Sequence, residues 1–356
     1  MGFEKRTVLE ICAGAGGQAL GLEQAGFHAV ACVEIDANAC ETLRVNRPRM
    51  RVLEMDVRNV NGREFRGVDL LAGGVPCPPF SVAGKQLGEN DERNLFPEAL
   101  RLVEEMQPRA VMLENVAGFA SAKFDDYRRG IIRHLHKLGY SATYKVINAS
   151  DLGVPQLRPR FVLVALRDGD FARFHWNHEP ILAKSVGETL CDLMAANHWL
   201  GASAWAARAK GIAPTLVGGS KKHGGPDLGP TRAKRQWASL GIDGMGIANE
   251  APRADFPENG MPRLTVRMTA RIQGFPDDWL FSGSKTAAYR QVGNAFPPPV
   301  ARSVASFILD TLNGSVAKYT VKEQHQLALL EPPGKYLTHE KKKRIKTKTN
   351  RLSSRK

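Results

Sequence analysis

The chain has 356 residues, of which 43% are hydrophobic and 24% are charged. This balance is typical of a globular protein, and the length predicts either two domains or one large domain with a smaller one. No apolar run approaches the roughly 18 residues of a membrane-spanning helix, which excludes an integral membrane protein. The charged start of the sequence has no pattern of a secretory signal, so we expect a cytoplasmic protein.

The five cysteines are an odd number, and no two of them form a C-x-x-C pair. A disulfide framework and a structural zinc site both need paired or closely spaced cysteines, so the sequence argues against each of them. His175, His178 and His223 also lack the spacing of metal ligands. We therefore expect a reducing compartment and no metal.

The formal net charge of +14 is concentrated near the C-terminus. Residues 335–356 contain ten Lys or Arg against one acidic residue, which leaves an excess of +5 for the rest of the chain. A segment so basic and so poor in apolar residues is expected to be disordered. It is either a phosphate-binding arm with salt-dependent affinity or a solvated terminus without a specific role.

Short apolar runs alternate with helix-like stretches over the first half of the chain. This alternation is typical of an α/β fold, in which a doubly wound, mostly parallel sheet has helices on both faces. We expect strands at residues 7–12, 28–33, 51–55, 68–72, 110–113, 142–147 and 161–166. The helices are expected at residues 18–25, 38–46, 96–106, 127–138 and, near the end of the pattern, 299–312.

The strand and helix pattern stops near Asp168, and residues 201–260 have a different character. Eleven glycines fall in this stretch together with several basic residues. Periodicity is weak there, which predicts a loop-rich second domain. Regular structure returns after Thr265, and we expect the helix at 299–312 to pack back on the first domain.

The first expected strand leads into a glycine-rich turn that contains Gly14, Gly16 and Gly17. Such glycines let a ligand approach the backbone, and the free N–H groups of a helix N-terminus favour an anion. Glu34, at the end of the second strand, has the spacing of a carboxylate that binds ribose hydroxyls. The pattern is compatible with NAD, with S-adenosylmethionine or with a structural turn. Asp56, after the third strand, is either an adenine contact or a turn aspartate.

Two further segments place reactive side chains after neighbouring strands. Cys77 lies among prolines on the loop after the fourth strand, which presents its sulfur in a fixed direction; the alternative is a small buried side chain. Glu114 follows the fifth strand at the same edge of the sheet, where a cap or a surface ion pair is the alternative role. Arg158 and Arg160 point the same way from an extended segment, toward the glutamate, a substrate oxygen or the surface.

These segments occur in the order found in the DNA (cytosine-5)-methyltransferases, and the chain resembles that family from residue 7 to about residue 312. Three features depart from the family pattern: Pro78 in place of a frequent Gln, Cys12 in place of an aromatic residue, and Glu10 in place of the more common Asp. The matching segments are Cys12-Ala13-Gly14-Ala15-Gly16-Gly17, Pro76-Cys77 with Phe80-Ser81, Glu114-Asn115-Val116, Gln156-x-Arg158-x-Arg160, Arg263-Leu264-Thr265-x-Arg267, Gln273-Gly274-Phe275-Pro276 and Gln291-Val292-Gly293-Asn294-Ala295.

The resemblance implies a Rossmann-like, S-adenosylmethionine-dependent methyltransferase fold with a smaller, loop-rich target-recognition domain. It implies methylation of cytosine C5 in double-stranded DNA, with S-adenosyl-L-homocysteine as product and without a metal. The base is flipped out of the duplex and Cys77 adds to C6, while Glu114 acts at N3. Arg160 holds O2 and Glu114, with Arg158 as support. The implied cofactor contacts are Cys12, Gly14, Gly16, Gly17, Glu34, Ile35, Asp56, Val57, Gly74, Pro76, Leu95, Asn294 and Ala295.

The same resemblance assigns DNA recognition to a variable region at about residues 174–261. Residues 81–94 suit a lid over the flipped base or a passive loop. The expected parts are a catalytic and cofactor-binding domain (1–173), a target-recognition domain (174–262), a return segment (263–316) and a basic tail (317–356). The expected DNA contacts are Ser81, Lys85, Gln86, Lys221, Lys222, Arg232, Lys234 and Arg235.

A compact catalytic unit of this kind resembles the methylase of a restriction-modification system, which protects host DNA from a cognate restriction endonuclease. We expect a monomer that associates with the nucleoid of a prokaryotic cytoplasm. One alternative is a cytosine-5 methyltransferase of transfer RNA, although its Cys-Phe-Thr segment is missing here; another is a catalytically inactive DNA-binding relative. A nicotinamide oxidoreductase explains the glycines but leaves the loop of Cys77 unexplained.

Overall fold

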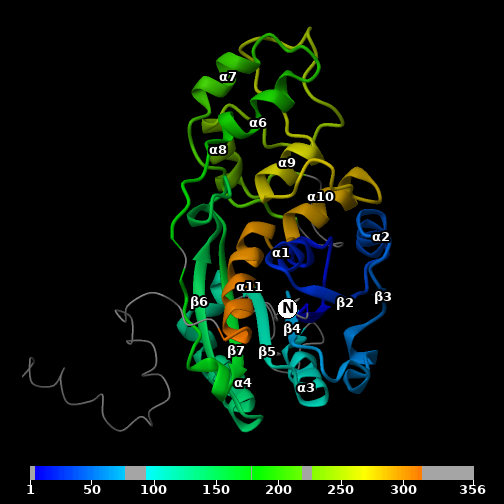
Figure 1. Cartoon of the computed structure of the whole chain (residues 1–356). Helices are drawn as coiled ribbons and strands as arrows, with labels where there is room; N and C mark the ends of the chain where they lie inside the picture. Colours follow the sequence, from blue (N-terminus) through cyan, green and yellow to red (C-terminus); the bar gives the residue numbers. More distant parts are fainter. Residues whose placement is uncertain (1–4, 77–93, 178, 219–226, 315–356) are drawn as a thin grey trace, which may run out of the picture. The chain divides into compact units, whose positions relative to one another are not determined.

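The computed structural model describes residues 5–76, 94–177, 179–218 and 227–314. The chain divides into the units Met1–Ala317 and Lys318–Lys356, and all described residues belong to the first. Figure 1 shows a sheet with helices on both of its faces. None of the described helices is both long enough and apolar enough to cross a bilayer.

The bounds of the elements are as follows. The strands are β1 Thr7–Ile11, β2 His28–Glu34, β3 Val52–Glu54, β4 Leu70–Gly73, β5 Ala110–Val116, β6 Tyr140–Asn148 and β7 Pro159–Arg167. The α-helices are α1 Gly17–Ala25, α2 Ala37–Asn46, α3 Phe96–Met106, α4 Asp125–Lys137, α5 Asp168–Phe171, α6 Val186–Ala195, α7 Ala202–Arg208, α8 Thr231–Ser239, α9 Val266–Gln273, α10 Lys285–Asn294 and α11 Pro298–Leu312. The short 3-10 helices are η1 Val57–Asn59, η2 Gly62–Phe65, η4 Ala117–Ala120, η5 Ala122–Phe124 and η6 Ala149–Asp151.

The seven strands form one sheet in the order β3-β2-β1-β4-β5-β7-β6. Strands β1 to β5 pair in parallel, whereas β7 is antiparallel to both β5 and β6. The predicted doubly wound, mostly parallel sheet is confirmed, with the last two strands as an antiparallel pair because their connection is too short for a helical crossover. The strand order reverses between β1 and β4, and open α/β sheets bind ligands at the carboxyl ends of strands at such a point.

Alternate residues of the central strands pack against opposite layers of helices. Val8 and Met112 belong to an apolar cluster with α1 and α11, whereas Leu9 and Val111 belong to a cluster with α3 and α4. The strands are therefore buried on both faces. This is why they are recognisable in the sequence as continuous apolar runs rather than as alternating patterns.

Local signals set several of the helix boundaries. Gly26 ends α1 in the left-handed conformation, with φ of 109°, which a residue without Cβ adopts at little cost. Asp36 begins α2 by accepting hydrogen bonds from the N–H groups of Asn38 and Ala39. Both helices begin one residue before their predicted start, directly after their N-cap residues Gly16 and Asp36.

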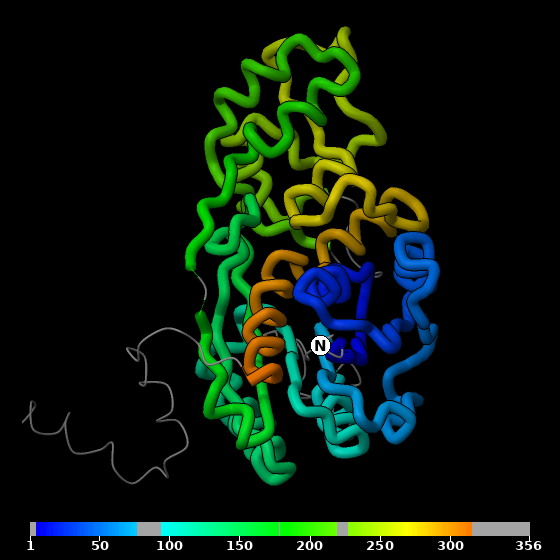
Figure 2. The backbone as a smooth tube through the Cα atoms, in the orientation of Figure 1, coloured from blue at the N-terminus to red at the C-terminus, as the bar shows by residue number. Residues whose placement is uncertain are grey.

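After β7 and α5 the chain leaves the sheet, and Figure 2 shows it pass through α6, α7 and α8 before it returns to α11. Helices α6 to α10 contribute to a second apolar cluster, which includes Trp205, Trp237 and Leu264. Helix α11 packs instead in the cluster of the sheet, as predicted for residues 299–312. The region 201–260 contains α7 and α8 in addition to its loops. The expected domain boundaries stay predictions.

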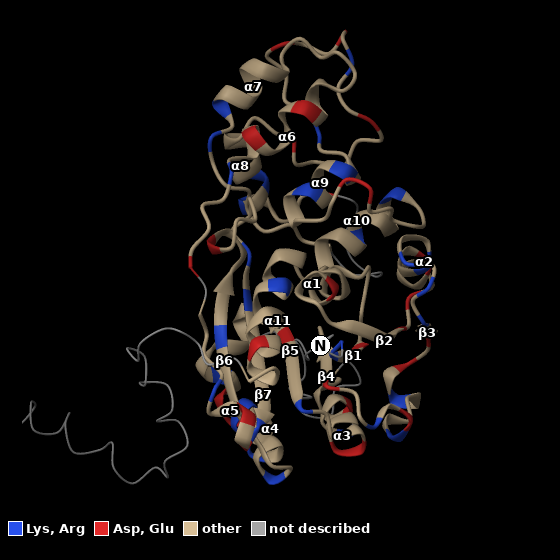
Figure 3. Cartoon of the chain, viewed as in Figure 1, with Lys and Arg blue, Asp and Glu red and all other residues tan. Residues whose placement is uncertain are grey.

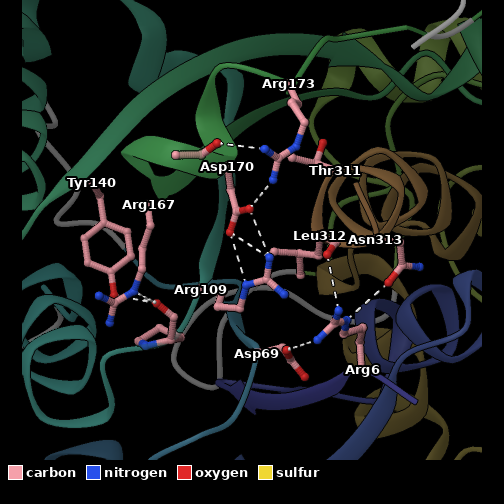
Figure 4. Close-up of polar contacts among 12 residues, drawn as sticks. Arg6, Asp69, Arg109, Tyr140, Arg167, Asp170, Arg173, Thr311, Leu312 and Asn313 are labelled. Atoms are coloured by element: carbon pink, nitrogen blue, oxygen red, sulfur yellow. Dashed lines mark hydrogen bonds and ion pairs between the residues drawn. The ribbon is translucent and has the colours of Figure 1, made fainter. Parts of the chain in front are cut away.

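Polar contacts tie the start of β1 to the end of α11 (Figure 4). Arg6 Nη1 lies 3.1 Å from the Asp69 carboxylate, which precedes β4. The same guanidinium donates to the Leu312 carbonyl at 3.3 Å and to the Asn313 side chain at 3.2 Å. The last turn of α11 is thereby fixed to the amino ends of β1 and β4.

A second group of charges surrounds Asp170 of α5 (Figure 4). Arg109 donates to both of its carboxylate oxygens, at 3.0 and 3.1 Å, and Arg173 Nη2 donates to Oδ1 at 2.5 Å. The Asp170 side chain is 11% exposed, while the two arginines are about one third exposed. One carboxylate therefore compensates two guanidinium groups, one directly before β5 and one just after α5.

Replacement of Asp170 by Ala should lower the free energy of unfolding by about 1–3 kcal/mol, because it leaves two partly buried guanidinium groups without their counter-charge. Urea unfolding monitored by circular dichroism measures the change. Glu250→Ala is the control, since Glu250 pairs with Arg253 on the surface, at 54% and 68% exposure, and should cost at most about 0.5 kcal/mol. Equal stabilities of the two variants would contradict the role of Asp170.

Candidate active site

The glycine-rich turn after β1 is open on one side and closed on the other. Gly14 has a φ of 54°, and a Cβ added there would meet no atom within 4 Å. A Cβ on Gly16 would lie 3.0 Å from the Trp279 ring, and one on Gly17 would collide with the Phe296 carbonyl. Of the three glycines, only Gly14 has open space at its Cβ position. Gly17 is needed for this close packing, and Gly16 has in addition a left-handed φ of 81°. The contact of these two glycines with a ligand stays a prediction.

The Glu34 carboxylate connects this turn to the end of β2. Its Oε2 accepts a hydrogen bond from the Gly14 N–H at 2.7 Å, and its Oε1 accepts from the N–H groups of Ile35 and Asp36, both at 2.8 Å. Oε2 therefore keeps a second lone pair for a further donor. The Ile35 side chain beside it is 67% exposed, so an apolar surface lies next to this acceptor.

Cys12 follows β1 and Asp56 follows β3, the two strands that flank β2 in the sheet. Burial raises the pKa of the Cys12 thiol to about 12. The thiol is therefore uncharged at neutral pH and behaves as a small apolar group. Asp56 accepts from the Arg58 N–H at 2.9 Å and begins η1. Asp56 therefore has the structural role in a turn that was one of its two predicted roles. Its contact with an adenine stays a prediction. Among the residues that the structure describes, no three His, Cys, Asp or Glu side chains gather as metal ligands would.

The backbone after β4 passes beside Glu114. A Cβ added at Gly74 would lie 3.2 Å from Oε2 of Glu114, so the carboxyl group nearly contacts the main chain. The Pro76 carbonyl accepts a hydrogen bond from the Leu95 N–H at 3.3 Å, which fixes the last described residue before Cys77. The expected site residues Cys77, Ser81, Lys85 and Gln86 lie outside the described residues, as does most of the expected lid.

Asn115 is a buried amide whose role the local sequence does not indicate. Its Nδ2 donates to the Val75 carbonyl at 2.8 Å, and its Oδ1 accepts from the Val116 N–H at 2.8 Å. The side chain leaves β5 on the face opposite to Glu114, because successive residues of a strand alternate. The hydrogen bond from Asn115 to Val75 therefore holds the turn after β4 against β5. The signals that could have pointed to it are its place next to a strand-end carboxylate and the Glu114-Asn115-Val116 segment shared with the family.

Glu114 of β5 and Arg160 of β7 form an ion pair at this edge of the sheet. Arg160 Nε lies 2.9 Å from Glu114 Oε1, and the two side chains are 11% and 13% exposed. The strand register pairs Glu114 with Val162, so Arg160 reaches it diagonally, along the same face of the sheet. The structure thus brings together two of the four predicted catalytic residues.

Burial acts on both members of this pair. Burial raises the pKa of Glu114, and the guanidinium groups of Arg160 and Arg158 oppose the shift without reversing it. Burial also lowers the pKa of Arg160, against the attraction of Glu114. A carboxyl group with a raised pKa keeps its proton to a higher pH than an ordinary glutamate does, which suits it to donate a hydrogen bond or a proton.

Arg158 is fully buried and does not contact Glu114. Its guanidinium donates to the carbonyls of Leu216 at 2.7 Å, of Gly293 at 2.7 Å and of Ala295 at 3.0 Å. The expectation that Arg158 holds the glutamate or a substrate oxygen is corrected. The three carbonyls occupy donors on the two terminal nitrogens of Arg158, whereas its buried Nε has no hydrogen-bond partner among the described residues.

Two buried glutamines extend the junction made by Arg158. Gln156 Nε2 donates to Gln273 Oε1 at 2.6 Å, and Gln273 Nε2 donates to the Ala295 carbonyl at 2.5 Å. Gln156 Oε1 accepts from the Leu216 N–H at 2.9 Å. Neighbouring Asn294, an expected cofactor contact, is exposed at the end of α10. These amides join the turn before β7 to the end of α9 and to the chain around Ala295.

Three of the predicted DNA contacts lie on α8 (Figure 3). Lys234 Nζ lies 2.7 Å from the Asp227 carboxylate, and its side chain is 25% exposed. Arg232 and Arg235 are exposed, and neither forms an ion pair within the described ranges. The charges available to a polyanion on this helix are therefore those of the two arginines. Lys221 and Lys222 lie outside the described residues.

Comparison with known proteins adds an independent line of evidence. The model of the C-5 cytosine-specific DNA methylase family matches residues 6–310. The Type II methyltransferase M.NaeI of Lentzea aerocolonigenes is 52% identical over 345 residues, which are 95% of this chain and 84% of the relative. The Type II methyltransferase M.NgoMIV of Neisseria gonorrhoeae is 54% identical over 313 residues, which are 86% of this chain and 98% of the relative.

Solved structures agree at the level of the fold. A Dnmt2 mutant of Spodoptera frugiperda has a TM-score of 0.61 at 18% identity, and it matches 85% of this chain and 99% of its own. The methyltransferase EhMeth of Entamoeba histolytica has a TM-score of 0.62 at 16% identity, over 87% of this chain and 99% of its own. The predicted Rossmann-like methyltransferase fold and the resemblance from sequence are confirmed: the chain belongs to the family of C-5 cytosine-specific DNA methylases.

Proposed function

We propose that this chain methylates C5 of a cytosine within a specific sequence of double-stranded DNA, through a covalent adduct with Cys77. The main support is the buried Glu114–Arg160 pair beside the backbone that leads to Cys77, in a chain of this family. The relatives at 52% and 54% identity are Type II methyltransferases. By analogy, the chain protects host DNA from a cognate restriction endonuclease.

The proposed chemistry follows from the weak nucleophilicity of cytosine C5. A thiolate adds to C6 first, so that a bond forms between Cys77 Sγ and C6 and electron density rises at C5. Glu114 donates a hydrogen bond or its proton to N3, which prevents negative charge from building up on the ring. After methylation, the C5 proton leaves to a base and the Sγ–C6 bond breaks. These two losses restore the aromatic ring and the free thiolate, and a proton that was donated to N3 returns to Glu114.

The surroundings of Glu114 suit it to this role. Arg160 fixes Oε1, while Oε2 faces the backbone at Gly74, where the base would enter. Arg160 uses Nε for Glu114 and donates from Nη1 to the Pro159 carbonyl at 2.9 Å. A guanidinium group has five N–H donors, so others remain for cytosine O2. Arg158 contributes by holding the chain around this edge rather than by touching the base.

The proposed cofactor is S-adenosyl-L-methionine, which supplies an electrophilic methyl group and leaves as S-adenosyl-L-homocysteine. The open face of Gly14, the spare lone pair of Glu34 Oε2 and the exposed Ile35 fit a ribose and an adenine at the ends of β1 and β2. The other residues proposed to hold the cofactor are Cys12, Gly16, Gly17, Asp56, Val57, Gly74, Pro76, Leu95, Asn294 and Ala295.

For DNA recognition we propose contacts from Arg232 and Arg235 of α8, whose charges are exposed. Lys234 is not among the proposed contacts, because the Asp227 carboxylate already neutralises its charge. The proposed recognition domain remains residues 174–262, between the catalytic domain at 1–173 and the return segment at 263–316. We also propose a cytoplasmic monomer that extrudes the target base from the duplex.

Two alternatives are less favoured. The matching family model is one of DNA methylases and spans residues 6–310, which favours DNA over transfer RNA as substrate. An inactive DNA-binding relative would have no need of a buried carboxylate and guanidinium at the carboxyl edge, where both are costly unless paired. The intact Glu114–Arg160 pair therefore supports an active enzyme.

Cys77→Ser should abolish methylation while DNA binding persists, because a serine hydroxyl is not ionised at neutral pH and is a much weaker nucleophile than a thiolate. Bisulfite sequencing of DNA from an expressing host measures methylation and reveals the target sequence, and a gel-shift assay measures binding. Cys191→Ser, which changes a partly buried thiol of α6, is the control and should methylate normally. Substantial methylation by Cys77→Ser would refute the nucleophile.

The methylation rate should fall as pH rises through the raised pKa of Glu114, because the carboxyl group then loses the proton that it donates at N3. Glu114→Gln cannot titrate, so its rate should lack this alkaline decline and be about 10²–10⁴-fold lower. Single-turnover methylation of a target duplex across a pH series measures both effects. The same alkaline decline in the variant would assign the titration to another group.

A further inference from the structure

Trp279 packs against the glycine-rich turn at Ala15 and Gly16, whereas a Cβ on Gly14 would meet no atom within 4 Å. The Trp279 side chain is 2% exposed, and its indole Nε1 donates a hydrogen bond to the Ala15 carbonyl at 3.2 Å. The edge of the ring would be 3.0 Å from a Cβ on Gly16. The indole therefore contacts two successive residues of the turn, one by a hydrogen bond and one by packing.

The Ala15 carbonyl depends on a donor from outside the helix. The hydrogen bonds of α1 begin with the Gly16 carbonyl, which accepts from the Leu20 N–H at 2.9 Å, so the Ala15 carbonyl lies outside that ladder. Ala15 is 1% exposed, and a buried carbonyl without a donor is costly. The indole N–H thus fixes the orientation of the peptide between Ala15 and Gly16.

Trp279 is itself held firmly against α1 and α2. The Arg47 guanidinium lies over the indole, 4.9 Å from the ring centroid, and Arg47 Nε pairs with Glu23 of α1 at 2.7 Å. Asn46 exchanges two hydrogen bonds with the backbone of Leu280, at 2.7 and 2.8 Å. The segment between α9 and α10 lies beside α2 in Figure 1. The indole is therefore a rigid support for the turn.

We propose that Trp279 is a positioning residue for cofactor binding. It acts through Ala15 and Gly16 and sets the shape of the turn whose open face, at Gly14, receives the cofactor. The inference rests on the proposed function, which assigns the cofactor to this turn. It means that a residue of the return segment, more than 260 positions away in the sequence, controls cofactor affinity.

Trp279→Phe removes the indole N–H but keeps an aromatic ring beneath Arg47. Isothermal titration of the full chain with S-adenosyl-L-homocysteine should show an increase in Kd of about three- to tenfold, as for a lost neutral hydrogen bond. The KM for S-adenosyl-L-methionine should rise by the same factor, while kcat at saturating cofactor and the Kd for DNA stay at their wild-type values. Hydrogen exchange at residues 15–17 should become faster.

Trp199→Phe is the matched control. Trp199 is also 2% exposed, and its Nε1 donates to the Pro257 carbonyl at 3.1 Å. Its ring packs edge-on against Phe256, and none of these partners belongs to the turn. The control should lose stability to a similar degree, with unchanged affinity for S-adenosyl-L-homocysteine and unchanged hydrogen exchange at residues 15–17.

The inference is overturned if Trp279→Phe binds S-adenosyl-L-homocysteine as tightly as the wild type, or if both variants weaken binding equally. If Trp279→Phe fails to fold, Arg47→Gln provides the test: it removes the cation above the ring and should cause a smaller loss of affinity, whereas unchanged binding would overturn the inference. A wild-type chain that does not bind S-adenosyl-L-homocysteine would refute the cofactor assignment itself, and this inference with it.

Discussion

The ion pair between Glu114 and Arg160 is the contact on which the rest of the site depends. It exists because β7 lies antiparallel beside β5 in a register that brings Arg160 diagonally across from Glu114. Both side chains are nearly buried, and removal of either would leave an uncompensated charge in a poorly solvated place. The pair therefore holds a carboxyl group with a raised pKa at the carboxyl edge of the sheet, facing the backbone at Gly74.

Segments far apart in the sequence assemble this edge. Arg158 donates hydrogen bonds to the carbonyls of Leu216, Gly293 and Ala295. Trp279 donates to the Ala15 carbonyl in the turn after β1. The chain that follows the proposed recognition region thus contributes to the support of both the catalytic pair and the turn proposed for the cofactor. Buried polar contacts make these connections, so their geometry is more restricted than that of apolar packing alone.

The sheet could be predicted from sequence because its strands are buried on both faces and are therefore continuous apolar runs. Glu114 could be located in the same way, since it follows such a run. The contacts of Arg158 and Trp279 could not be predicted, because their partners are between 58 and 264 residues away. Lys234 was expected to contact DNA because it belongs to a basic stretch. Its ion pair with Asp227 could not be foreseen, because nothing in the local sequence indicates that the two side chains meet.

The structure of the chain bound to a duplex with 5-fluorocytosine at the target position tests the central claim most directly, because fluorine at C5 prevents the proton loss that would release the enzyme. A covalent bond from Cys77 Sγ to C6 is expected, with the Glu114 carboxyl about 2.6–3.2 Å from N3 and Arg160 still paired with it. A base without that bond, or a Glu114 side chain turned away from the ring, would contradict the account.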